Sequence, residues 1–393
     1  MKEYIVTQNI LDLRSSATDE TDDNFIGQLT VGETLYLTDE EIIGTIPNGG
    51  TTNIWKSDNF NRLVSADGVR LKNYADKKAE FIADPFNQSF IDPTDPANEA
   101  KWKVNWGIVD LEIWKIWRDY DTKGEGVKVA IIDTGVQCLN NDLNTKINKS
   151  VSFATNSDGS IDNNDDDLNP YHGTKSAGII GANGLFAKTV IGVAPNCSIN
   201  VYKATNGLFD FGSVILSIQE AIKDGMKIIS MSFTCQDDIT LAEWINYAKS
   251  QDVILIAAAG DAGSNQKCYP ASYPGCLSIG AYFLDGTDNR GIYKTNSNYN
   301  DAVTFVAPGK DVLTTSIGTQ PTYHQETSAA TAFVAGLFAL LISKVPTFNY
   351  DQLTDLISLH SITETIEISS GRSDYEGYGI LNLRSVLEIL NIN

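Results

Sequence analysis

The sequence predicts an α/β protein with a doubly wound parallel sheet, preceded by a small all-β domain. From residue 101 onward, short apolar runs alternate with stretches of helical periodicity, which is typical of parallel strands covered by helices on both faces. Residues 3–74 instead contain short strand-like runs separated by glycine and asparagine turns, as in small barrels. The length of 393 residues suits one large domain and one small one.

We expect the small domain at residues 1–75, a linker at 76–101 and the large domain at 102–393. The linker is expected because its residues are polar, include three prolines and show no periodicity. The strands expected in the small domain are 3–7, 25–30, 34–38, 53–55, 62–64 and 68–71. Those expected in the large domain are 127–132, 198–203, 227–232, 253–258, 276–281 and 303–306. The helices between them are expected at 173–181, 211–224, 241–250, 328–343 and 350–358.

Charge and hydropathy argue against two classes of partner. The net charge of -21 and the pI near 4.4 disfavour binding to nucleic acid and to anionic membrane surfaces, because both need basic patches. The longest apolar run, residues 332–342, is shorter than the about 20 residues that cross a bilayer. We therefore interpret it as a buried helix and expect no membrane span.

The cysteines and the N-terminus bear on the compartment. Five cysteines occur without a CxxC pair, a pattern of neither a disulfide framework nor a zinc site. We expect reduced thiols, with a bridge between Cys268 and Cys276 as the alternative. No apolar leader follows Met1, which predicts a cytoplasmic protein if Met1 is the natural start. A secreted or periplasmic protein whose signal peptide has been removed is the alternative.

Three polar residues stand where a domain of this class builds its sites. Asp133 closes the first buried strand of the large domain and precedes a turn glycine, and sites in open α/β sheets form at the carboxyl ends of strands. His172 begins a helix of small residues, and Ser328 begins the apolar helix near the C-terminus. Each has a plainer interpretation by itself, as a turn residue, a structural histidine and a helix cap.

Together, the segments around these residues resemble the subtilase family of serine peptidases. They are DTG at 133–135, HGT at 172–174 and TSAATA at 327–332, with Asp, His and Ser in the chain order of subtilisin. Similar pieces are WGI at 106–108, GVAP at 192–195, SMSF at 230–233, AAAG at 257–260, YPASYP at 269–274 and APG at 307–309. The resemblance spans about residues 102–393.

The resemblance implies a serine endopeptidase mechanism for a protein or peptide substrate. Ser328 would attack the carbonyl carbon, His172 would act as its general base, and Asp133 would orient the imidazole and stabilise its charged form. An acyl-enzyme would form and water would release it, with no cofactor required.

Two of the residues that depart from the family's pattern near Ser328 bear on its chemistry. Asp261 stands where the family places the asparagine that donates to the oxyanion, and an ionised carboxylate donates no hydrogen bond. We therefore expect activity to favour acidic pH, because a protonated Asp261 regains a donor. Glu326 replaces a glycine and brings charge beside the nucleophile. These changes favour an alternative, a pseudopeptidase that binds peptides or partners through the old groove, whereas the intact triad favours the enzyme.

The family's primary specificity pocket corresponds here to Ser232, Phe233 and Thr234, with Cys268 near its base. Thr234 replaces a glycine of the family. We therefore expect a narrower pocket that prefers small or medium residues before the cleaved bond.

A calcium ion is an alternative interpretation of the acidic segment 158–167, which contains five aspartates. A solvated acidic loop is the commoner explanation of such a run. The family's usual calcium loop corresponds to residues 185–189, which offer few oxygen ligands and include a lysine. We expect that site to be missing and assign no metal ligand.

The small N-terminal domain resembles a bacterial SH3-like domain in LDLRSS at 11–16, IGQL at 26–29, VGETL at 31–35 and Trp55. This resemblance implies a binding partner or a cell-wall ligand for residues 1–75. The alternative is an N-terminal pro-domain, which subtilases commonly use to fold.

Overall fold

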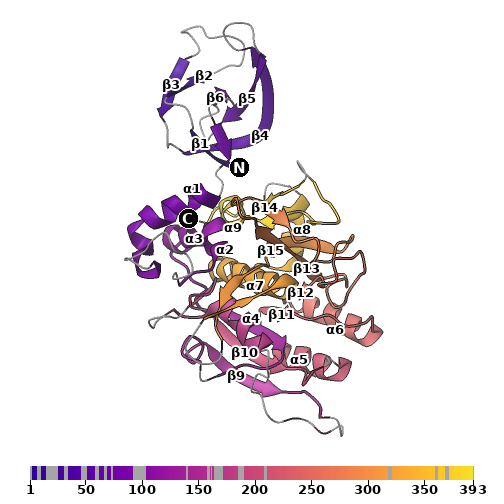
Figure 1. Cartoon of the computed structure of the whole chain (residues 1–393). Helices are drawn as coiled ribbons and strands as arrows, with labels where there is room; N and C mark the ends of the chain where they lie inside the picture. The colour runs from indigo at the N-terminus through magenta and orange to yellow at the C-terminus, as the bar shows by residue number, and fades with distance from the viewer. Residues whose placement is uncertain are drawn as a thin grey trace. The chain divides into compact units, whose positions relative to one another are not determined.

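The computed structural model describes residues 74–91 and 103–392, apart from residues 139, 157–159, 161, 163–170, 185–189, 208–209, 317–320, 359–361 and 368–370. Before residue 74 it describes the backbone of seven strands. The chain forms two units, Met1–Ala79 and Glu80–Asn393 (Figure 1).

The N-terminal unit contains one antiparallel sheet in the order β3-β2-β6-β5-β4-β1-β7. Its strands are β1 (Lys2–Val6), β2 (Ile10–Arg14), β3 (Phe25–Thr30), β4 (Thr34–Thr45), β5 (Thr51–Ser57), β6 (Arg62–Ser65) and β7 (Val69–Leu71). The turns between them and their side chains lie outside the described residues. The SH3-like assignment of residues 1–75 and its partner therefore stay predictions.

The sheet of the large unit has the order β14-β13-β12-β11-β8-β10-β9, with β15 paired to β13. Its strands are β8 (Lys128–Asp133), β9 (Ile147–Ser152), β10 (Ser198–Lys203), β11 (Ile228–Met231), β12 (Ile254–Ala258), β13 (Cys276–Leu284), β14 (Arg290–Ile292) and β15 (Val303–Pro308). All pairs are parallel except that of β13 with β14. Because β8 comes first in the chain and lies inside the sheet, the predicted doubly wound topology is confirmed.

The edge strand β9 was absent from the predicted elements. Its sequence INKSVS is polar, and most of its side chains are partly exposed. A strand at an edge of the sheet needs no continuous apolar run, which is why hydropathy alone overlooked it.

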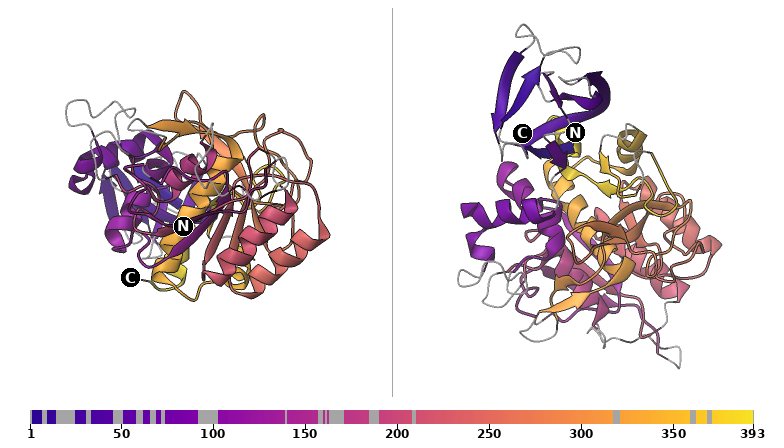
Figure 2. Two further views of the ribbon diagram at one scale, coloured as in Figure 1. Left: turned by 90° about the horizontal axis from the view of Figure 1, so that it is seen from below. Right: turned by 45° about the horizontal axis from the view of Figure 1, so that its top comes forward.

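Helices cover both faces of the sheet (Figure 2). Helices α5 (Phe211–Lys223) and α6 (Ile239–Ser250) pack on one face, over side chains of β8, β11 and β12. On the other face, α4 (His172–Gly181) packs against α7 (Glu326–Lys344). The unit also contains α2 (Trp106–Asp110), α3 (Ile113–Asp119), α8 (Tyr350–Ser358), α9 (Leu383–Ile389) and the hairpins β16 (Val312–Thr314) with β17 (Thr322–His324) and β18 (Thr363–Glu364) with β19 (Ile380–Leu381).

Helix α7 is the central helix of this unit. Every residue from Thr327 to Ile342 is buried, which confirms the predicted buried helix. Its 19 residues are long and apolar enough for a membrane span by length and composition, but 89% of the apolar window is buried inside the protein. The protein core therefore accounts for its hydropathy. Gly336 permits this packing, because a Cβ there would lie 2.5 Å from Cβ of Val193.

The linker expected at 76–101 is wrong for much of its length. Residues Tyr74–Ala83 form helix α1, and Pro85–Phe90 form the 3-10 helix η3. Asp84 caps η3, since its carboxylate accepts a hydrogen bond from the backbone N–H of Phe86 at 2.9 Å. Residues 92–102 lie outside the described residues.

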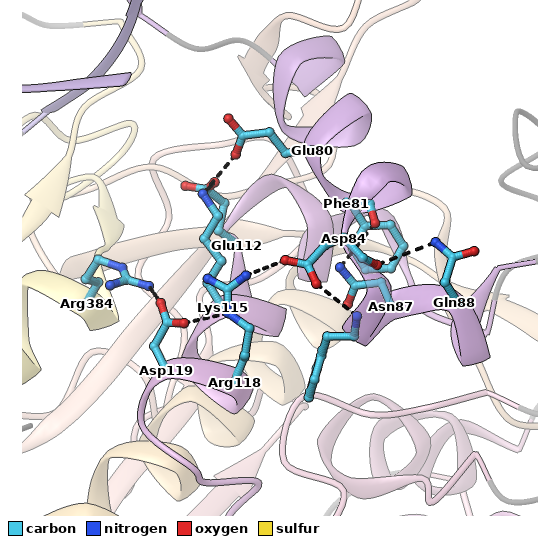
Figure 3. Close-up of polar contacts among 11 residues, drawn as sticks. Glu80, Phe81, Asp84, Asn87, Gln88, Glu112, Lys115, Arg118, Asp119 and Arg384 are labelled. Carbon is cyan, nitrogen blue, oxygen red and sulfur yellow. Dashed lines mark hydrogen bonds and ion pairs between the residues drawn. The ribbon is translucent and has the colours of Figure 1, made fainter. Parts of the chain in front are cut away.

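The segment 80–91 packs on α3 within the large unit (Figure 3). Phe81 is fully buried and meets the Trp114 ring edge-on at 5.9 Å between centroids. Lys115 forms an ion pair with Glu80 at 2.9 Å, and Arg118 forms another with Asp84. Polar composition suggested a linker, but the acidic side chains pair with cations of α3 while one aromatic ring enters the core.

Candidate active site

Asp133 and His172 meet at the carboxyl end of the central strand. Asp133 ends β8 and is fully buried, while His172 is the first residue of α4 and is one quarter exposed. The Nδ1 atom of His172 lies 2.7 Å from Oδ1 of Asp133, and the backbone N–H of Thr134 donates to the same oxygen at 2.7 Å. A Cβ on Gly173 would lie 2.2 Å from the carbonyl oxygen of Gly135, so glycine is what allows this close approach.

Ser328 lies in the first turn of α7 and is buried. Its Oγ donates to the carbonyl oxygen of Ser232 at 3.0 Å, and Oγ of Ser232 donates back to the carbonyl oxygen of Ser328 at 3.1 Å. Because Ser232 directly follows β11 and β11 pairs with β8, these bonds fix Ser328 at the sheet end that carries Asp133. The N-terminus of α7, with its backbone N–H groups and the positive end of its dipole, lies at this same end of the sheet.

Asp261 follows β12 and contacts the start of α7. Its Oδ1 accepts hydrogen bonds from the backbone N–H of Thr327 at 2.9 Å and from the Thr327 hydroxyl at 2.5 Å. The residue as a whole is exposed, but Thr327 covers Oδ1 of its carboxyl group. Burial raises the pKa of Asp261, the charge of Glu326 raises it further, and the bonds from Thr327 and the charge of His172 oppose the rise.

Glu326 is the first residue of α7 and has a left-handed backbone, with φ of 67°. Glycine adopts this conformation without the steric cost that a Cβ brings. The carboxylate of Glu326 accepts a hydrogen bond from Nδ2 of Asn296 at 2.7 Å. A fixed negative charge therefore stands two residues before Ser328.

The sequence profile of the subtilase family matches residues 124–379. The chain belongs to the subtilase family.

Three relatives illustrate the extent of this similarity. The chain is 34% identical over 265 residues to the thermophilic serine proteinase of Bacillus sp. (strain AK1), which covers 66% of this chain and 62% of that protein. It is 32% identical over 274 residues to subtilisin DY of Bacillus licheniformis, and this match covers 68% of this chain and 92% of that protein. It is 30% identical over 340 residues to subtilisin E of Bacillus subtilis (strain 168), covering 83% and 82%. The chain thus spans less than two thirds of the first of these relatives.

The last of these matches reaches beyond the large domain expected from the sequence. Residues 102–393 make up about three-quarters of the chain, so a match over 83% of it also includes residues before 102. This agrees with the packing of residues 80–91 on the large unit of the subtilase.

The residues expected to line the specificity pocket of this subtilase differ in their surroundings. Ser232 is bound to Ser328 through the paired hydrogen bonds described above. Phe233 is buried in the core cluster under α5 and α6, so its side chain contributes to packing there. Thr234 is exposed. Cys268 is partly buried, and Nδ2 of Asn298 lies 3.4 Å from its Sγ.

Two polar residues of the site were not selected from the sequence. Ser176 lies one turn after His172 on α4, and its Oγ is 3.3 Å from Oδ2 of Asp133. The same Oγ is 3.3 Å from Nε2 of His324, at the end of β17. The i, i+4 spacing from His172 could have indicated Ser176. His324 had no such signal, because the packing of a distant hairpin brings it there.

The acidic segment expected as a calcium alternative lies mostly outside the described residues. Among the residues the structure does describe, no group of three or more His, Cys, Asp or Glu side chains is arranged to hold a metal ion. Asp162 pairs with the buried Lys203 at 3.2 Å. Residues 185–189 also lie outside the described part of the chain. The calcium alternative at 158–167 and the expected loss of the family's calcium site at 185–189 therefore both stay predictions.

Proposed function

We propose that this subtilase is a serine endopeptidase with Ser328 as the nucleophile, His172 as the general base and Asp133 as the residue that orients His172. The observation that carries the proposal is the 2.7 Å contact between His172 Nδ1 and the buried Asp133. An imidazole held in this way presents Nε2 as a base. A serine at the start of a buried helix at the same sheet end supplies the hydroxyl.

The proposed reaction has two halves. The Ser328 hydroxyl turns from the carbonyl oxygen of Ser232, gives its proton to Nε2 of His172, and its oxygen bonds to the substrate carbonyl carbon. The tetrahedral intermediate collapses when His172 protonates the leaving amine, which breaks the peptide bond and leaves an acyl-enzyme. Water then attacks the ester, again with His172 as base, and the acid product leaves Ser328.

Oxyanion stabilisation sets the proposed pH dependence. The Ser328 backbone N–H is one donor to the developing oxyanion, and the side chain of Asp261 occupies the second position. Since burial raises the pKa of Asp261, a protonated carboxyl group that can donate persists to higher pH than for an exposed aspartate. Ionisation removes that donor and adds a repelling charge, so the rate falls as pH rises through the pKa of Asp261.

A fluorophosphonate probe tests the nucleophile. We expect the purified protein to be labelled at Ser328 and to hydrolyse peptides between about pH 5 and 8, a range that brackets histidine titration. Ser328→Ala should lose both labelling and hydrolysis while keeping the fold. The matched control is Ser343→Ala, because Ser343 lies at the other end of α7 with its Oγ bonded to the carbonyl oxygen of Leu340 at 2.6 Å. Equal hydrolysis by the Ser328 variant would eliminate the proposal.

A pseudopeptidase that binds peptides is the second candidate function. The carboxylates of Asp261 and Glu326 favour it, because both place negative charge at the start of α7 beside Ser328. In that case the protein should bind peptides but show neither labelling nor hydrolysis at any pH in this range.

A further inference from the structure

The buried side of Asp133 leads into a short chain of polar side chains from three elements. Asp133 ends β8, Ser176 lies on α4 and His324 ends β17. Oγ of Ser176 is 3.3 Å from Oδ2 of Asp133 and 3.3 Å from Nε2 of His324. The His324 ring also meets the His172 ring edge-on, with centroids 4.8 Å apart and planes at 88°. His324 therefore touches the proposed catalytic pair twice, once through Ser176 and once through the ring.

When Asp133 is ionised, only one arrangement of donors and acceptors is possible along this series of hydrogen bonds. A carboxylate only accepts hydrogen bonds, and a serine hydroxyl has one proton to donate. Ser176 must therefore donate to Oδ2 of Asp133 and accept at its own oxygen from His324. This requires the tautomer of His324 that carries its proton on Nε2.

The three hydrogen-bonded side chains are shielded from water, so water does not compete for their donors and acceptors. Asp133 and Ser176 are fully buried, and His324 is 5% exposed. Burial lowers the pKa of His324 well below its ordinary value, and the nearby charges of His172 and Lys175 lower it further. His324 thus stays neutral and donates one hydrogen bond without adding a charge beside His172.

We propose that Ser176 and His324 are positioning residues that hold the Asp133 carboxylate with Oδ1 facing Nδ1 of His172. The inference rests on the proposed peptidase function. It adds two residues that act through Asp133 and do not touch the substrate.

The same chain adjusts the basicity of His172. The hydrogen bond from Ser176 partly neutralises the negative charge of the Asp133 carboxylate. The carboxylate therefore stabilises the imidazolium form of His172 less than it would without this bond. The other charged or titratable groups that act on this region are His324 from β17, Asp261 after β12 and Lys175 on α4. Removing the Ser176 hydroxyl therefore raises the pKa of His172. Because His172 must be neutral to accept the Ser328 proton, the acid limb of kcat/KM moves to higher pH.

Four variants separate this role from a merely structural one. Ser176→Ala should lower kcat by about threefold to tenfold, the worth of one ordinary hydrogen bond, with KM little changed and the acid limb shifted upward. His324→Phe keeps the ring but loses the donor, and should shift the limb in the same direction by less. His324→Gln should restore most of the activity, since its amide Nε2 can donate to Ser176. In a Ser176→Ala background, His324→Phe should add no further shift in the limb.

The control is Ser217→Ala on α5, which removes an equally buried hydroxyl whose partner is the carbonyl oxygen of Ser213 at 2.7 Å. It should leave both kcat and the pH limb unchanged. Ser176 and His324 variants that lower the melting temperature but leave the limb where it is would overturn the proposal. Fully additive effects of Ser176→Ala and His324→Phe on the limb would also overturn it.

A second readout does not depend on catalysis. The chain has only three histidines, so NMR titration of the imidazole signals can follow His172 directly. Ser176→Ala should raise its pKa, and an unchanged pKa would sink the inference even in an active enzyme. If the protein with its natural residues neither cleaves nor labels, the proposed function fails, and the titration alone decides whether the chain acts on His172.

Discussion

At the residue scale, one carboxyl group governs the proposed chemistry at the start of α7. Asp261 uses Oδ1 to accept two hydrogen bonds from Thr327, and the proposed mechanism assigns its other oxygen to the oxyanion. That oxygen donates only when it is protonated, and an amide nitrogen in its place would donate at every pH.

Asp261→Asn tests this directly. At neutral pH we expect kcat to rise by up to about 100-fold, because one oxyanion donor is worth on the order of 10²–10³ in rate. At acidic pH the gain should be smaller, since burial raises the pKa of Asp261 and a larger fraction of its carboxyl groups is protonated and able to donate there. The measurement is kcat against pH for one peptide substrate. A gain of the same size at both pH values, or a loss at neutral pH, would contradict the account.

Glu326→Gln provides the matching control. It removes the charge that raises the pKa of Asp261 but keeps the side-chain length. The pH at which activity falls should therefore move to lower values in a profile of kcat against pH. If Glu326 only crowds the groove, that pH should stay the same, because glutamine occupies the same space.

At the element scale, the helical segment 80–91 belongs to the fold of the large unit. Phe81 lies against Trp114, and the cations of α3 pair with Glu80 and Asp84. The ion pairs are partly exposed to solvent and add little by themselves, so the buried ring carries most of the stabilisation from this segment.

Phe81→Ala in the full chain should therefore destabilise the large unit by about 3–5 kcal/mol, as is usual when a buried aromatic ring is removed. Gln88→Ala, on the exposed side of the same segment, should stay within about 0.5 kcal/mol. Denaturant unfolding followed by tryptophan fluorescence measures both. If the two variants are equally stable, the segment is not part of the cooperative unit.

At the scale of the whole molecule, the thiols report how completely the sheet and helices exclude solvent. The five cysteines all lie among the described residues, and the structure joins no two of them in a disulfide. Cys197 and Cys276 are buried, and burial raises the pKa of Cys197 to about 12. A thiolate, which is the reactive form, is therefore scarce at these positions.

We expect a disulfide reagent such as Ellman's to titrate five thiols in denaturant. In the native protein, Cys197 and Cys276 should react only as fast as the protein opens. Mass spectrometry of the labelled peptides identifies which thiols have reacted. Fewer than five thiols in denaturant without reductant would reveal a disulfide and contradict the free state.

Much of the fold could be predicted because its strands carry their own signal. Strand β12 is entirely apolar and β8 has a central apolar run, and both are buried along almost their whole length, so these strands were visible in the sequence. The edge strand β9 and the segment 80–91 were not, because their polar residues are partly exposed or paired with other elements. The hydropathy of a residue indicates whether its side chain is buried. It does not indicate which distant charged side chain will form an ion pair with it.

The candidate site divides in the same way. The sequence alone determined the fold class and the three segments that contain Asp133, His172 and Ser328, because each segment combines small residues that permit close backbone approach with one reactive side chain. Only the tertiary structure decided that Ser176 and His324 stand behind Asp133, that Asp261 bonds to Thr327, and that Phe233 lies in the core. Those relations depend on how the β16–β17 hairpin and α7 pack across the sheet, and no local pattern encodes a contact between residues so far apart in the chain.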